Sequence, residues 1–289
     1  MSIATTWTST VNGAQKATVT TQRLDASSPS PKSTVQYTYL GNLPLVTKIS
    51  EWNYYSGTQP TNPDRITTVA YTYGCCFSNL FLRPTSVTVT NGAGTQTITQ
   101  TTMGYDSYGT GLISVTGVTE HDDTNFGSSF TPRGNATSIA KLVSGSTYLT
   151  SSMTYDTTGQ IRSVSDDAGK ITSMNYADNF YSDGSANPPS VYTPAGPTNA
   201  YLTQVSLPLS GSISYGYYYG SGQKASTTDQ NAGKYYSHYY DALGRPTEAI
   251  SPISGRKTLG TLRVSNPWRS CTHRVPRLGE SGAFGVFLV

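Results

Sequence analysis

The sequence predicts an all-β fold of serial antiparallel β-hairpins, which together form a curved, partial spiral shell. Three observations support this prediction. Short runs of β-forming residues recur along the chain, turn residues separate them at short intervals, and a Tyr-Asp-x-x-Gly motif returns in the second half. The 289 residues include 22 tyrosines, and only 12% of all residues are charged. No amphipathic helix pattern is found before residue 253.

The predicted strands follow one another from about residue 34 to 252. Runs of strand-like composition cover 46–55, 65–73, 85–90, 95–103, 111–118, 136–143 and 146–155. Asn91-Gly92 lies between two of these runs and is a strong hairpin signal, because both residues tolerate positive φ. Further along, Ile213, Tyr215, Tyr217 and Tyr219 alternate with other residues, which is the period of a strand and not of a helix.

The turns recur with a period of about 20 residues, which indicates stacked repeats of strand, turn and strand. Tyr155 and Tyr176 are 21 residues apart, with the turn Asp-Asp-Ala-Gly between them. The stretches 229–249 and 104–118 contain the same parts. Each repeat would pair with the open edge of its neighbour, and the native twist of strands would make the growing sheet coil.

The residues of the motif have mechanical reasons. An Asp at the start of a tight turn accepts hydrogen bonds from backbone N–H groups two or three residues further on. A Gly then takes the positive-φ position, which predicts this conformation at Gly159, Gly169, Gly233 and Gly244. The Tyr before the turn is expected to place its ring at a fixed height on the sheet, so that successive rings stack as a ladder.

These motifs resemble those of the Rhs/YD-repeat family. The resemblance is clear over residues 104–250 and only loose over 34–103. Its residues are those of the repeat turns: Tyr105, Asp106, Gly109, Arg133, Gly134, Asn135, Tyr155, Asp156, Gly159, Asp167, Gly169, Tyr176, Asp229, Gly233, Tyr240, Asp241, Gly244 and Arg245.

The resemblance implies a spiralling β-shell without catalytic activity, in a secreted or cell-surface protein. Similar bacterial proteins enclose a C-terminal toxin, and teneurins use a similar shell for adhesion. The implied partners are further YD repeats of the same or a longer chain and an encapsulated toxin domain. This chain is much shorter than the family's shells, lacks the aspartyl self-cleavage junction of many members, and has no recognisable toxin domain.

Three regions are expected. Residues 1–33 form a Thr- and Ser-rich edge segment, and residues 34–253 form the repeat sheet. Residues 254–289 contain no tyrosine but five of the arginines. Two hypotheses fit this tail: a disordered or out-of-frame end, or a small effector remnant or cationic docking segment.

The sequence predicts no catalytic, cofactor or metal site, and hence no enzyme. The acidic cluster at Glu120, His121, Asp122 and Asp123 lies in a predicted turn, where such residues are expected for the turn itself. Asp166 and Asp167 are adjacent, so on a strand they would point to opposite faces, and Asp167 is explained by its turn. The three cysteines lack the spacing of a metal site.

An alternative function is a carbohydrate-binding or adhesive module. Tyr215, Tyr217 and Tyr219 could stack on sugar rings of cell-surface glycans, although the repeat explains the same residues. A net charge of +3 gives no indication of nucleic-acid binding. The sequence has no apolar run long enough for a membrane span and no visible secretory signal.

Overall fold

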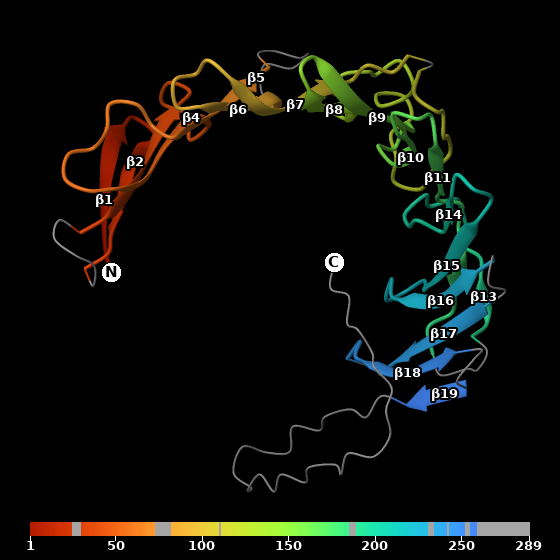
Figure 1. Cartoon of the computed structure of the whole chain (residues 1–289). Helices are drawn as coiled ribbons and strands as arrows, with labels where there is room; N and C mark the ends of the chain where they lie inside the picture. The colour runs from red at the N-terminus through yellow and green to blue at the C-terminus, as the bar shows by residue number, and fades with distance from the viewer. Residues whose placement is uncertain are drawn as a thin grey trace, which may run out of the picture.

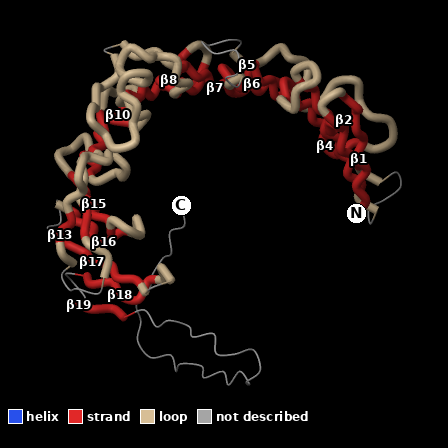
Figure 2. Tube along the Cα trace, turned by 180° about the vertical axis from the view of Figure 1, so that it is seen from behind, coloured by secondary structure: helices blue, strands red, loops and turns tan. Residues whose placement is uncertain are grey.

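A computed structural model describes residues 1–24, 30–72, 82–109, 111–184, 189–230, 234–241, 243–251 and 255–258. These residues form nineteen strands and no helix, so the all-β prediction is confirmed. The strands build one sheet that follows a wide arc from the N-terminal β1 to β19 (Figure 1). The same arc is seen from behind, with loops gathered at its bend (Figure 2).

The first eleven strands run as a continuous series. They are β1 (Ser2–Thr10), β2 (Gly13–Gln22), β3 (Lys32–Tyr39), β4 (Val46–Tyr55), β5 (Arg65–Tyr71), β6 (Pro84–Asn91), β7 (Thr97–Tyr105), β8 (Ala136–Ser144), β9 (Thr147–Tyr155), β10 (Ile161–Ser165) and β11 (Ile171–Asn175). Each pairs with the next in antiparallel register, so the prediction of serial hairpins is confirmed.

The second part of the sheet has one irregularity. Its strands are β12 (Phe180–Tyr181), β13 (Val191–Tyr192), β14 (Gln204–Ser206), β15 (Ser212–Tyr218), β16 (Lys224–Asp229), β17 (Lys234–Tyr240), β18 (Pro246–Ser251) and β19 (Gly255–Thr258). β11 pairs with β14, and the antiparallel series then continues to β19. β12 and β13 form a short side hairpin, of which β12 pairs in parallel with β15.

One predicted strand is wrong. Residues 111–118 make only an isolated parallel bridge, between Ile113 and Asp156, and lie within the long loop 106–135 between β7 and β8. The run reads as a strand because it is rich in β-branched residues. Gly111 and Gly117 both adopt positive φ, which interrupts an extended chain. The third copy of the repeat, at 104–118, is therefore not a strand–turn–strand unit.

The hairpin predicted at Asn91-Gly92 forms between β6 and β7, but its turn differs from the predicted one. Gly92 does not take a positive φ, whereas Gly94 does, at 71°. Asn91 occupies the start of the turn and not its centre: its side-chain Oδ1 accepts hydrogen bonds from Thr95 N (2.9 Å) and Gln96 N (3.2 Å). The hairpin β6–β7 thus turns through Asn-x-x-Gly.

Buried side chains are few, because a single sheet has no second layer packed along its faces. One group of them lies where the loops 106–135, 156–160 and 193–203 meet, at the bend of the arc between β9 and β14 (Figure 1). The buried members are Leu112, Val118, Tyr155, Asp156, Thr157 and Asn199. We call this meeting point of the three loops the junction. None of the described segments is a helix that could cross a membrane.

The predicted division into three regions stays a prediction. β2 pairs with β3 across the first boundary, and β18 pairs with β19 across the second. In the tail, the structure describes only 255–258, and the rest of 254–289 lies outside the described residues, as do the three cysteines.

Candidate functional site: the Asp-x-x-Gly corners and the junction

Three corners of the sheet share one geometry, built around Asp156, Asp166 and Asp241. In each, the backbone N–H of the aspartate donates to the carbonyl four residues on, and the N–H of the glycine donates back to the aspartate carbonyl, at 2.9–3.0 Å. The aspartate Oδ1 accepts from the amide four residues on, at 3.1, 2.8 and 3.0 Å respectively. The carboxylate therefore satisfies donors that the chain reversal would leave unpaired.

The glycine of the corner takes the left-handed conformation, as predicted. Its φ is 89° at Gly159, 73° at Gly169 and 75° at Gly244. A side chain at this position would be strained in such a conformation. Gly233 lies outside the described residues, so the corner predicted at Asp229 is not described in full.

Asp167 has a role other than the predicted one. Asp166, and not Asp167, closes its own turn, because it stands three residues before Gly169. The Oδ1 of Asp167 accepts instead from Thr150 N of β9, at 3.0 Å. β10 pairs with β9 only from residue 152 onward, so Asp167 caps a strand N–H beyond the end of the ladder.

Asp106 also caps a distant segment. Its own backbone has a φ of 55°, and its carboxylate accepts from Gly134 N (2.7 Å) and Asn135 N (2.8 Å). Tyr108 donates its hydroxyl to the same carboxylate, and burial together with this bond raises the pKa of Tyr108. The predicted turns at 105–109 and 133–135 therefore bind each other through the Asp106 carboxylate.

Sequence reasoning missed two further aspartates of this kind. Asp178 accepts from Thr198 N, and Asp183 accepts from Gly220 N and Ser221 N. Neither is followed by Gly at the corner spacing, so no local pattern marks it. Both cap segments about 20 or more residues away in the chain.

The tyrosines close hairpins through their hydroxyl groups. In the hairpins β4–β5, β6–β7 and β8–β9, the last residue of the second strand donates to the carbonyl of the first residue of the first strand. These bonds are Tyr71 to Val46 (2.9 Å), Tyr105 to Pro84 (2.9 Å) and Tyr155 to Ala136 (2.7 Å). Tyr39 reaches Lys16 O and Tyr217 reaches Leu202 O in similar fashion. We call these bonds tyrosine latches.

The predicted ladder of stacked rings is wrong. None of the ring contacts among the described residues joins Tyr105, Tyr155, Tyr176 and Tyr240 with one another. The physical reason is spacing: Tyr105 and Tyr155 end β7 and β9, and alternate strands lie about 9–10 Å apart. Tyr176 instead faces the guanidinium of Arg162, and Tyr240 meets Tyr218 edge to face.

Replacing Tyr155 by phenylalanine is expected to lower the free energy of unfolding by about 1 kcal/mol. The ring is buried and its packing is retained, while the Ala136 carbonyl loses its hydroxyl partner. Urea denaturation followed by tryptophan fluorescence measures the change. Tyr54→Phe is the matched control, because Tyr54 is 73% exposed, and it should leave the midpoint unchanged.

The junction is organised around Asp156 and Thr157, which are 0% and 1% exposed. Besides its own turn, the Asp156 carboxylate accepts from Arg162 (3.3 Å) and Asn199 (3.1 Å). Thr157 bonds to Val115 through its hydroxyl and to Ile113 through its backbone N–H. The corner of β9–β10 is therefore held by loop 106–135 on one side and by loop 193–203 on the other.

Arg133 and His121 bring charge to the junction. Arg133 donates to the carbonyls of Thr157 (2.6 Å), Phe130 (2.7 Å) and Gly127 (3.0 Å), and also to that of Phe126. The His121 ring contacts the same Thr157 carbonyl through Nε2 and Asp123 through Nδ1. The turn residues at 133–135 and the cluster at 120–123 were predicted as separate turns, and the structure brings both to the β9–β10 corner.

Tyr215, Tyr217 and Tyr219 do not form one binding row. Lys224 lies over the ring of Tyr215 at 4.5 Å, and Tyr217 stacks on Tyr201 at 4.7 Å. Tyr219 packs on Tyr192 at 4.3 Å and meets Phe180 edge to face. Of the three, only Tyr219 is exposed, at 43%.

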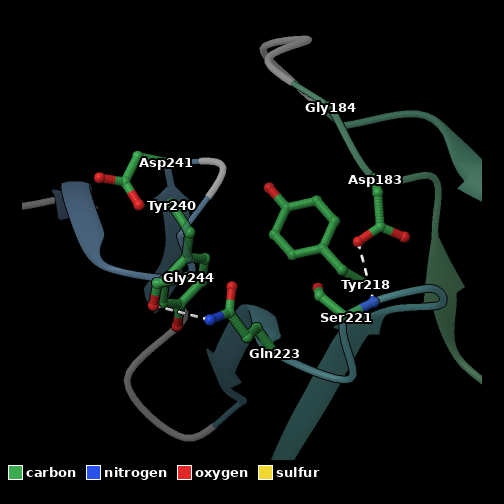
Figure 3. A pocket seen from close by; sticks show the side chains of 8 residues that line it. All are labelled: Asp183, Gly184, Tyr218, Ser221, Gln223, Tyr240, Asp241 and Gly244. Atoms are coloured by element: carbon green, nitrogen blue, oxygen red, sulfur yellow. Dashed lines mark hydrogen bonds between the residues drawn. The ribbon is translucent and has the colours of Figure 1, made fainter.

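A pocket of about 400 Å³ lies beside the Asp241 corner. The ring of Tyr218 stands between Asp183 on one side and Tyr240, Gln223 and Gly244 on the other (Figure 3). The polar side chains that line the pocket form hydrogen bonds with other parts of the protein. Asp183 accepts from the backbone N–H groups of Gly220 and Ser221, and Gln223 donates to Gly244 O at 2.8 Å. Tyr218 donates to His238 O at 3.0 Å. These contacts join neighbouring hairpins.

The described residues contain no group of three or more metal-ligating side chains. The carboxylates of the corners act as acceptors for backbone N–H groups, which is a structural task. In this sheet, local hydrogen bonds of this kind stabilise the fold where other domains use a second hydrophobic layer.

The structure is expected to lose stability in acid. Hydrogen bonds lower the pKa of three aspartates. The main donor is Arg245 for Asp241, the Gly117 N–H for Asp123 and Asn125 for Asp122. Burial raises the pKa of Asp183, but its bonds to Ser221 and Gly220 outweigh this and lower it.

A carboxyl whose pKa is lower in the folded state binds fewer protons there, so protons favour unfolding. The stabilisation is complete above the unfolded pKa of about 4 and is lost as the pH falls through the folded pKa values. Melting temperatures measured from pH 7 down to pH 2 should therefore fall below about pH 4. A constant melting temperature over this range would contradict the expectation.

Comparisons with known proteins give structural matches only. No family model matches the chain, and no curated protein matches it. The crystal structure of TcdB2-TccC3 matches with a TM-score of 0.38 and 14% identity, over 84% of this chain and 11% of that one. The same complex without its hypervariable C-terminal region gives 0.39 and 15%.

This chain spans about a tenth of the length of the TcdB2-TccC3 chain that it matches. A porin-like protein from Bacteroides uniformis also matches, with a TM-score of 0.25 and 11% identity, over 86% of both chains.

Proposed function

We propose that the chain is a non-catalytic segment of an Rhs/YD-repeat shell of a secreted or surface protein. The observation that carries the proposal is the arc of serial hairpins, turned at each Asp-x-x-Gly corner by the residues that resemble the family's motif (Figure 1). In this function the corners set the path of the wall, and the wall encloses a toxin domain in complete homologues.

The partners proposed are further YD repeats and an enclosed domain. β1 supports the first of these: its nine residues carry no charge, eight of them are exposed, and β2 is its one strand partner among the described residues. Natural sheets protect their edges with charges or proline, so an unprotected edge favours pairing with another strand. Ile3 and Trp7, at 61% and 59% exposure, offer apolar contacts there.

The proposal is tested on the native protein. Antibodies against the chain should precipitate from source cells or their medium a species larger than 30.9 kDa. Treatment with protease should leave an enclosed domain intact, and the domain should become cleavable after denaturation. Recovery of only the free chain, with no protected passenger, would contradict the shell. The DNA beside the coding sequence should also continue the Tyr-Asp-x-x-Gly repeat.

A second candidate is glycan binding, favoured by one observation. Tyr192 and Tyr219 are 37% and 43% exposed, and their rings pack together in a tilted arrangement with centroids 4.3 Å apart. β13, which carries Tyr192, lies on the outer side of the arc in both views (Figures 1 and 2). Exposed aromatic rings provide apolar faces with a polar tip, which suits a sugar ring.

If this candidate is correct, Tyr219→Ala should abolish binding on a glycan array while the melting temperature stays within a few degrees. Tyr217 is a poor choice for this test, because its hydroxyl forms a latch and its ring stacks on Tyr201. Tyr54→Ala, at another exposed ring, is the control and should retain binding. No binding by the unmodified chain excludes the candidate.

A further inference from the structure

His121 faces a hydrogen-bond acceptor at each of its ring nitrogens. Nδ1 lies 2.7 Å from Asp123 Oδ1, and Nε2 lies 3.1 Å from the carbonyl oxygen of Thr157. A neutral imidazole carries one N–H and donates to only one acceptor, whereas the imidazolium donates to both. In the neutral form one nitrogen lone pair would face an oxygen lone pair. The geometry therefore suits the charged ring.

The charged groups around His121 come from three segments. The loop that carries His121 contributes Asp123, and also Glu120 and Asp122, which flank His121 in the sequence. At the β9–β10 corner, the buried Asp156 directly precedes Thr157, whose carbonyl contacts His121 Nε2. The segment before β8 contributes Arg133, which shares the Thr157 carbonyl with His121.

Asp123 stays ionised in the pH range where histidines titrate. The hydrogen bonds from Gly117 N–H and from His121 lower the pKa of Asp123. The contact therefore pairs an ionised carboxylate with an imidazole, the type of side chain whose ordinary change of charge falls between pH 5 and 8.

The contact holds a long loop in place. Loop 106–135 meets the corner through Ile113, which exchanges backbone bonds with Tyr155 and Thr157, and through Val115. Two residues before His121, Thr119 N donates to Pro197 O of loop 193–203 at 2.9 Å. His121 therefore acts where the loop meets both other parts of the junction.

We propose that protonated His121 locks loop 106–135 onto the Asp156–Thr157 corner, and that loss of this proton as the pH rises releases the loop. Deprotonation removes one of the two bonds and leaves the Asp123 carboxylate without a cationic partner at His121. The lock is a pH-responsive device at the junction, and it does not depend on the proposed shell function.

Hydrogen exchange of the full chain, followed by mass spectrometry at pH 5.5 and pH 8, tests the lock. Protection factors, which correct for the intrinsic pH dependence of exchange, are compared for the peptide that covers 113–121. We expect protection in the wild-type chain to fall about tenfold or more at the higher pH. His121→Gln should give the same low protection at both values, since glutamine does not titrate.

The other described histidine provides the matched control. His238 lies in β17, and its Nε2 is 3.5 Å from Thr227 Oγ1, far along the sheet from loop 106–135. His238→Gln should retain the wild-type pH response in 113–121. The NMR titration of the two imidazoles in the wild-type chain gives a second readout. The midpoint of loop release should coincide with that of His121 and not with that of His238.

Two results would overturn the proposal: equal protection of 113–121 at both pH values in the wild-type chain, or an unchanged pH response in His121→Gln. Should that variant fail to fold, the wild-type titration decides. A release midpoint that does not follow the His121 titration then counts against the lock.

Discussion

Replacement of Asp156 by alanine is expected to lower the free energy of unfolding by about 3 kcal/mol or more. The carboxylate is fully buried and accepts five hydrogen bonds. Three come from its own turn and reach Oδ1. The other two, from Arg162 and Asn199, reach Oδ2 and connect the corner with the rest of the junction. Alanine would remove the acceptor that all five donors share, and one of these donors, Arg162, carries a charge.

Asp166→Ala is the matched control for this variant. The Asp166 corner has the same backbone bonds and the same glycine conformation, but it is exposed and no other segment bonds to the Asp166 carboxylate among the described contacts. Its loss should cost about 1 kcal/mol. Urea denaturation of both variants measures the difference. Equal losses would mean that the corner alone accounts for the stability, and that the junction adds nothing.

The corners were predictable because their bonds are local. The aspartate, the glycine and the amide it accepts from all lie within five consecutive residues, so the sequence contains the whole arrangement. The strands were predictable for a similar reason. Alternating β-forming residues between such turns placed β4 at 46–55, where the structure has it. Tyr155 could be located in the same way at the end of a strand, but its hydroxyl partner lies 19 residues back, in the neighbouring strand.

The junction was not predictable because its contacts join distant residues. Asn199 and Asp156 are 43 residues apart, and Thr157 and Val115 are 42 apart. Loop 106–135 was read as a turn, a strand and a turn, since β-branched residues raise strand propensity wherever they occur. One signal was present in the sequence. The stretch 106–135 separates two strands by far more residues than a hairpin needs, and long loops tend to have a task of their own.

The Asn-x-x-Gly turn of β6–β7 shows how a local pattern can be assigned to the wrong residue. Asn-Gly predicts a two-residue turn with positive φ at both positions. In the structure Asn91 serves as the side-chain acceptor that aspartate provides elsewhere, and the glycine three residues on adopts the positive φ. The corner motif is therefore broader than Tyr-Asp-x-x-Gly.

In this turn Gly92 is needed for close approach to a neighbouring segment and not for a positive φ. We therefore expect Gly92→Ala to lower the free energy of unfolding by about 3 kcal/mol or more. The φ of Gly92 is one that alanine adopts, so conformational strain is not the cause. A Cβ at Gly92 would overlap the backbone carbonyl oxygen of Pro63, which precedes β5. Because the obstacle is backbone, relief requires β6 to move away from β5.

Gly94→Ala separates this steric effect from the conformational one. Gly94 has a φ of 71°, and no atom lies within 4 Å of the point that an alanine Cβ would occupy, so alanine there is strained but not obstructed. We expect a loss of about 1 to 2 kcal/mol. Thermal and urea denaturation of the two variants should therefore place Gly92→Ala well below Gly94→Ala in stability. The reverse order would indicate that the Asn-Gly step forms the centre of the turn after all, with β5 and β6 further apart at this end than the contact with Pro63 requires.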